Sequence, residues 1–101
     1  MTDAGGAQAI AQAYVDVLDT WFTDPSDRPA VQWDATTEFN FGWVFFWNSQ
    51  LFLATADPRH ALEGNSPFIV DRNDGSVRPI GTGFPLQQSI SAYADAWTAW
   101  S

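Results

Sequence analysis

The chain has 101 residues, 46% of them hydrophobic and 16% charged, and we expect a single domain over residues 1–101. Twelve acidic residues against four basic ones give a formal net charge of -8, which argues against binding to nucleic acid or to an anionic membrane surface. The chain has no cysteine, and this excludes disulfides, thiolate nucleophiles and cysteine-based metal sites.

The N-terminal region has the periodicity of an amphipathic helix over residues 7–22. Apolar side chains recur there at three- and four-residue steps, with Asp16 and Asp19 off the apolar stripe. Pro25 and the acids around it end the helix and begin a short loop. The absence of a positively charged segment before the helix gives no sign of a secretory signal, and we expect a cytoplasmic protein.

The next segment is rich in aromatic and β-branched residues, which predicts strands near 31–39 and 43–48 joined as a hairpin around Gly42. Residues 43–47 are apolar on both faces, as in a central strand covered on two sides. Residues 51–53 are predicted to form a short further strand.

A second hairpin is predicted from residues 67–71 and 76–80, because Asp74-Gly75 supplies the turn chemistry between them. Pro79 places its strand at a sheet edge. Pro85 suits a first helical position, and apolar residues then continue at helical spacing to the C-terminus. The predicted fold is α+β, with an antiparallel sheet of four to five strands, a helix at each end packed on it, and the order α-β-β-(β)-β-β-α.

Catalytic and cofactor motifs find little support. His60 is the only histidine, and it stands in a turn without a serine elbow to pair with. Gly81 and Gly83 begin a Gly-x-Gly pattern, but Leu86 occupies the place of the third glycine. We therefore predict no catalytic residue, no metal site and no cofactor.

Aromatic residues make up 16% of the chain, including six tryptophans, and they do not all fit one side of a small sheet. Tryptophans that reach the surface beside acidic residues have the composition of a protein-binding hot spot. The predicted partner-binding residues are Trp33, Asp34, Glu38, Trp43, Trp47 and Asn48.

Four local patterns stand in a fixed order: FGWVFFWNS at 41–49, LEGNSPFIVD at 62–71, GSV at 75–77 and GTGFP at 81–85. Together they resemble the YrhB-like family, also called the immunity protein 35 family, over a little more than half of the chain. The resemblance implies a small α+β bacterial immunity protein of a polymorphic toxin system. Its motif residues, expected to be structural, are Gly42, Gly64, Asn65, Pro67, Gly75, Gly81, Thr82 and Pro85.

The resemblance implies a protein partner, a toxin domain that is neutralised by stoichiometric occlusion, and no catalysis. Two departures from the family pattern, the bulky Phe46-Trp47 pair and Ser66 in place of a glycine, bear on which partner is bound. A chaperone-like module that binds many clients through its aromatic residues is the alternative, and a small-molecule-binding domain is a second one.

Overall fold

The computed structural model describes residues 1–22, 25–62, 65–81, 83 and 85–100. The helices are α1 (Ala4–Asp16), α2 (Gln50–Thr55) and α3 (Leu86–Trp100), and 3-10 turns lie at Val17–Trp21, Trp33–Ala35 and Pro58–His60. The strands are β1 (Pro29–Val31), β2 (Thr37–Phe39), β3 (Gly42–Phe45), β4 (Trp47–Ser49), β5 (Phe68–Asp71) and β6 (Val77–Pro79).

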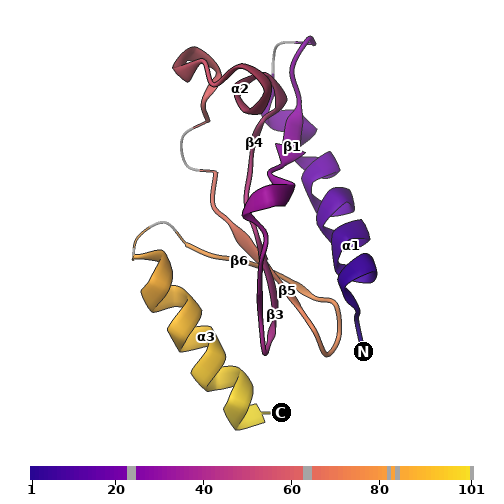
Figure 1. The fold of residues 1–101 in the computed structure, drawn as a ribbon, viewed down its shortest axis with the longest axis vertical. Helices are drawn as coiled ribbons and strands as arrows, with labels where there is room; N and C mark the ends of the chain where they lie inside the picture. The colour runs from indigo at the N-terminus through magenta and orange to yellow at the C-terminus, as the bar shows by residue number, and fades with distance from the viewer. Residues whose placement is uncertain (23–24, 63–64, 82, 84, 101) are drawn as a thin grey trace.

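The strands are antiparallel throughout and form a four-stranded sheet, in the order β2-β3-β5-β6, and a separate pair, β1-β4. A terminal helix lies on either side of these strands (Figure 1). This confirms the predicted α+β fold. The predictions that β3 is central and that Pro79 lies in an edge strand are also confirmed.

The two faces of the sheet carry two different cores, because side chains alternate between the faces along a strand. Trp43, Phe45, Phe68 and Val70 pack with α1 on one face. The residues between them in the strands, Val44 and Ile69, pack with Phe41, Ile80 and α3 on the other. The strands are therefore the middle layer between two helices.

Helix α1 begins earlier than the predicted 7–22 because Asp3 caps it: the carboxylate accepts a hydrogen bond of 2.7 Å from Gly6 N–H. The helix ends at Asp16 and continues as the 3-10 turn Val17–Trp21. Its inner face consists of Ala7, Ala11 and Val15, which are fully buried.

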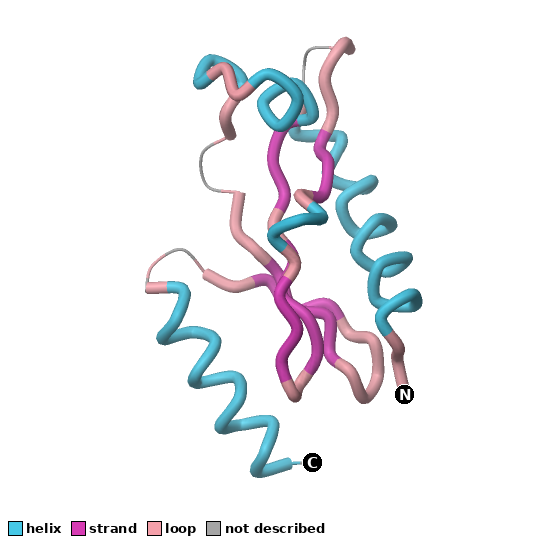
Figure 2. The backbone as a smooth tube through the Cα atoms, in the orientation of Figure 1, coloured by secondary structure: helices cyan, strands magenta, loops and turns pink. Residues whose placement is uncertain are grey.

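The predicted strand at residues 51–53 is wrong, because these residues belong to α2, near one end of the molecule (Figure 2). Ser49 caps this helix by accepting a hydrogen bond of 3.1 Å from Phe52 N–H. The predicted strand at 43–48 is divided at Phe46, and its two halves, β3 and β4, belong to different ladders.

The hairpin predicted around Asp74-Gly75 is confirmed as β5 and β6, and Gly75 has the positive φ of 71° that its turn requires. Gly42, at the start of β3, has φ 146°, and a Cβ added there would lie 2.1 Å from the Val70 carbonyl oxygen. No larger residue fits at Gly42 without displacing β5.

Candidate functional site

The candidate site is a bulge in the long hairpin that carries β1 and β2 on one arm and β3 and β4 on the other. Val31 pairs with Trp47, and Thr37 pairs with Val44. Five residues, 32–36, separate the paired positions on the first arm, but only two, 45–46, separate them on the second. The three extra residues are accommodated as the 3-10 turn Trp33–Ala35, which carries Trp33 out of the sheet.

Trp33 is held in place although 44% of it is exposed. Its ring meets the ring of the fully buried Phe45 edge to face, with centroids 6.1 Å apart and an interplanar angle of 87°. An aromatic ring that is anchored on one side and open on the other loses little conformational entropy when a partner covers it. This is the geometry expected of a binding hot spot.

Three surface hollows meet at Trp33, with volumes of about 520, 420 and 360 Å³. They extend toward α1, along β1, and toward α2. The polar side chains that line them are mainly amides, together with two carboxylates and one guanidinium. These residues are Gln8, Gln12, Asp16, Arg28, Gln32, Asp34 and Gln50. The surface around the indole therefore offers both hydrogen-bond donors and acceptors.

Glu38 lies on the exposed side of β2 and is held by Arg72. The Arg72 guanidinium donates to the Glu38 carboxylate at 2.7 Å and to the Phe39 carbonyl at 3.0 Å. It also lies 4.4 Å from the centroid of the Trp43 ring. Glu38 is thus available at the surface, whereas Trp43 is covered by the arginine that Glu38 orients.

The prediction that Trp43 and Trp47 lie at the binding surface is corrected by the structure. Each is only 4% exposed and belongs to the core that α1 covers. Trp47 also donates from its indole N–H to the Ser66 carbonyl at 2.8 Å. Their places in β3 and β4 point them toward α1, a consequence of strand register that the composition alone did not show.

Asn48 also has a structural role. Its side-chain oxygen accepts hydrogen bonds of 2.8 Å from Ser49 N–H and 2.9 Å from Leu62 N–H. This ties β4 to the connection that follows α2. Of the six predicted binding residues, the structure therefore leaves Trp33, Asp34 and Glu38 at the surface, with Trp33 and Asp34 adjacent on the bulge.

Asp27, which the sequence analysis did not single out, supports the α2 side of this region. Its carboxylate accepts hydrogen bonds from the Ser49 hydroxyl, at 2.5 Å, and from Leu51 N–H, at 3.2 Å. Burial opposes ionisation, but these hydrogen bonds outweigh it and lower the pKa of Asp27 below its ordinary value. No local pattern could have indicated this role, because the partners lie more than twenty residues away.

The family model described as immunity protein 35 matches residues 6–99. The chain belongs to the immunity protein 35 family. It is 35% identical over 72 residues to the uncharacterized protein YrhB of Escherichia coli strain K12, an alignment that covers 71% of this chain and 76% of YrhB. No solved structure matches the chain.

The residues that carried the resemblance to the immunity protein 35 family lie mostly in turns or form hydrogen bonds that connect one element to another. Besides Gly42 and Gly75, Asn65 donates from its amide to the Trp47 carbonyl at 2.7 Å, and the Pro67 carbonyl accepts from Ile80 N–H at 2.8 Å. Pro85 directly precedes α3, and its carbonyl accepts from Gln88 N–H at 3.0 Å. A Cβ at Gly81 would meet nothing within 4 Å. Gly64 and Thr82 lie outside the described residues.

Two kinds of feature are absent from the ranges that the structure describes, a metal-binding cluster and a membrane-spanning helix. Within them, no three His, Asp or Glu side chains are grouped so as to hold a metal ion. The helices of the same ranges include none that is long and apolar enough to cross a membrane. His60 ends the 3-10 turn Pro58–His60, which Asp57 caps by accepting from Arg59 N–H at 3.0 Å.

Proposed function

We propose that the protein is an immunity protein that binds a toxin domain and neutralises it by stoichiometric occlusion, without catalysis of its own. Membership of the immunity protein 35 family supports a protein partner. The contact surface is proposed around Trp33, because this residue lies on an inserted turn, packs against Phe45 and is bordered by three hollows. Trp33, Asp34 and the surrounding glutamines form the proposed contact surface.

The charge of the chain supports a basic partner surface. A net charge of -8 attracts a cationic protein from a distance, and Asp34 and Asp16 lie where the partner would dock. Association with such a partner should slow as the salt concentration rises, because salt screens exposed charges over about 8 Å at physiological ionic strength.

A dedicated partner is favoured over many clients by the small amount of apolar surface. Among the residues whose burial the structure describes, the exposed large hydrophobic ones are Met1, Val17 and Trp33. A chaperone-like module needs a broad apolar area to hold unrelated unfolded chains. An exposed tryptophan with a polar border, such as Trp33, suits a specific contact better.

The test compares two variants of the chain as baits for protein capture from the native lysate, followed by a toxicity assay. The wild type should retain one dominant protein at near-equimolar ratio, and co-expression should rescue cells that express this protein. Trp33→Ala should lose both capture and rescue while it remains folded. Val17→Ala, which also removes an exposed apolar side chain, is the matched control and should keep both.

Two results would contradict the proposal. Trp33→Ala could capture and rescue as well as the wild type, which would move the contact surface elsewhere. Alternatively, the wild type could retain a broad set of unrelated proteins and suppress their aggregation, which would replace the immunity function by the chaperone-like one.

A further inference from the structure

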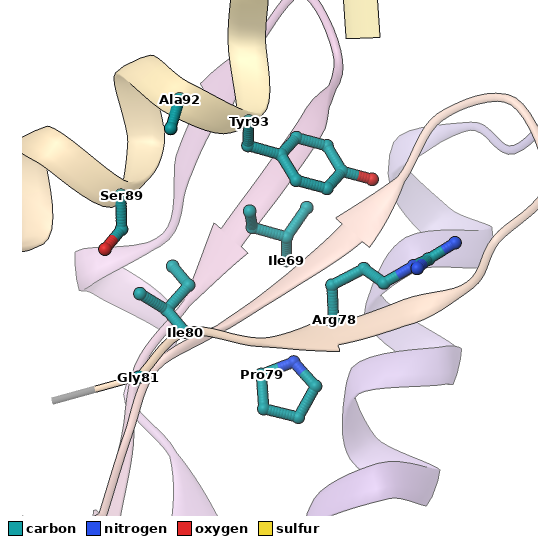
Figure 3. A pocket seen from close by; sticks show the side chains of 8 residues that line it. All are labelled: Ile69, Arg78, Pro79, Ile80, Gly81, Ser89, Ala92 and Tyr93. Carbon is teal, nitrogen blue, oxygen red and sulfur yellow. The ribbon is translucent and has the colours of Figure 1, made fainter. Parts of the chain in front are cut away.

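A separate hollow of about 380 Å³ lies between β6 and α3, on the face of the sheet opposite α1. Figure 3 shows Ile69 and Ile80 on the sheet side, and Ser89, Ala92 and Tyr93 on the helix side. Its lining is mainly apolar, and its volume falls within the range of small-molecule pockets. The hollow exists because α3 does not close over the edge strand.

One positive charge lines this hollow. In Figure 3 the Arg78 side chain extends along β6 toward the end of the hollow where the Tyr93 hydroxyl lies. Arg78 donates only a long hydrogen bond, 3.3 Å from Nε to the Ser76 hydroxyl, and within the described ranges it forms no ion pair. Its terminal nitrogens are therefore available to an anionic group, which guanidinium binds in a bidentate manner.

Two acidic side chains, Asp71 and Asp74, lie in the β5–β6 turn beside Arg78, and the charge of Arg78 contributes to lowering the pKa of Asp74 after the hydrogen bonds from Ser76. Asp71 accepts hydrogen bonds from the Tyr93 hydroxyl and, at 2.8 Å, from Asn73 N–H. Asp74 accepts one of 2.9 Å from Ser76 N–H. These bonds fix both carboxylates within the β5–β6 turn. Neither carboxylate lines the hollow, whereas Arg78 does, so Arg78 is the charged group that a ligand in the hollow would meet.

The edge strand itself argues against an added peptide strand as the occupant. Ile80 N–H donates to the Pro67 carbonyl. Main-chain groups alternate in direction along a strand, so those of Pro79, which is opposite Phe68, point away from β5 toward the open edge. A proline there offers no N–H to an incoming strand. A small molecule needs no such pairing.

We propose that the hollow between β6 and α3 binds a small monocarboxylate with an apolar body, the body lying against Ile69, Ile80 and Ala92 and the carboxylate meeting Arg78. The Ser89 hydroxyl offers a second polar contact on the helix side. This site is distinct from the contact surface around Trp33 and does not depend on the proposed toxin binding.

The experiment is a titration of the labelled protein followed by amide chemical shifts, with phenylacetate as the probe and phenylacetamide as its neutral counterpart. Both are measured at about 0.15 M salt, where the repulsion between the acidic protein and an anion is screened beyond about 8 Å. Phenylacetate should bind with a dissociation constant of about 1 mM, typical of so small a ligand. The shifts should centre on β6 and the facing turn of α3.

The charge and the cavity are tested separately. Phenylacetamide should bind about tenfold more weakly, and Arg78→Gln should weaken phenylacetate by a similar factor. Ala92→Leu, which fills the hollow with a residue that favours helix, should abolish the shifts. Arg59→Gln removes an exposed arginine outside the hollow and should leave binding unchanged.

Three results would overturn the proposal: no saturable shift at the lining residues, equal binding of the acid and the amide, or unchanged binding in Ala92→Leu. The comparison of acid and amide uses the wild-type chain, so it holds whatever the stability of the variants.

Discussion

Helix α1 packs on the sheet through Ala7, Ala11 and Val15, which expose no surface, whereas α3 packs through Ile90 and the half-buried Tyr93 and Trp97. Small side chains let α1 approach the strands closely, and the aromatic residues of β3, β4 and β5 fill the space. Large side chains hold α3 farther out and leave a hollow beside β6. In the described ranges, Trp97 also has a buried indole N–H without a hydrogen-bond partner. The core beneath α1 is therefore close-packed, whereas α3 leaves a hollow beside the edge strand β6.

The largest expected effect comes from a cavity in the close-packed face. Phe45→Ala should lower the free energy of unfolding by about 3–5 kcal/mol, because Phe45 is fully buried and its neighbours cannot move in. Urea unfolding followed by circular dichroism measures this. Ile90→Ala on the other face is the comparison and should cost about 2 kcal/mol. Equal losses would show that the two faces are packed alike.

Replacing one alanine on each terminal helix with leucine tests the difference in packing between α1 and α3. Ala11→Leu should lower the free energy of unfolding by about 1–3 kcal/mol, because the larger side chain has no space between α1 and the sheet. Ala92→Leu, exposed on α3 and facing the hollow, should change stability by less than about 0.5 kcal/mol. Thermal unfolding of the two variants measures the difference, and a similar loss in both would contradict the model of an open α3 face.

The hydrogen bond from Tyr93 to Asp71 ties α3 to β5, and Tyr93→Phe should cost about 1 kcal/mol. Burial, together with the hydrogen bond to Asp71 and its charge, raises the pKa of Tyr93 above its ordinary value of 10.0. Since the unfolded chain then ionises first, this stabilisation is complete below pH 10 and is lost as the pH rises above 10.

Denaturant unfolding between pH 8 and pH 11 tests this dependence, because wild type should lose stability above about pH 10 more steeply than Tyr93→Phe. Parallel curves would mean that the tie between α3 and β5 contributes nothing that depends on pH.

A modest effect on stability is expected at the proposed contact surface. Trp33→Ala removes a ring that is 44% exposed and contacts Phe45 edge to face, so the loss should be about 1 kcal/mol. Chemical unfolding of wild type and variant measures it. A loss above about 2 kcal/mol would place Trp33 with Phe45 in the close-packed core and remove the main support for a binding role.

Patterns confined to a few neighbouring residues predicted the fold well. Asp74-Gly75 predicted the hairpin β5–β6, and the apolar run at 43–47 predicted a strand covered on both faces, which holds for β3 up to Phe45. What failed depended on distant partners. Residues 51–53 resemble a strand locally, but α2 is fixed by Ser49 and by the Asp27 carboxylate, more than twenty residues away.

The candidate site was predicted only in part for a related reason. The composition predicted that some tryptophans reach the surface, and Trp33 does. Which ones do so depends on the difference in length between the hairpin arms, and this appears only when the pairings of Val31 and Thr37 are known. Trp43 and Trp47 are buried because the register directs them to α1.

The turn that carries Trp33 is bounded by two ladders whose pairings are fixed independently, β1 with β4 and β2 with β3. Residues added to this turn, removed from it or exchanged within it leave both ladders in register. The segment that carries Trp33 can therefore change in length and sequence while the strands on either side keep their pairing.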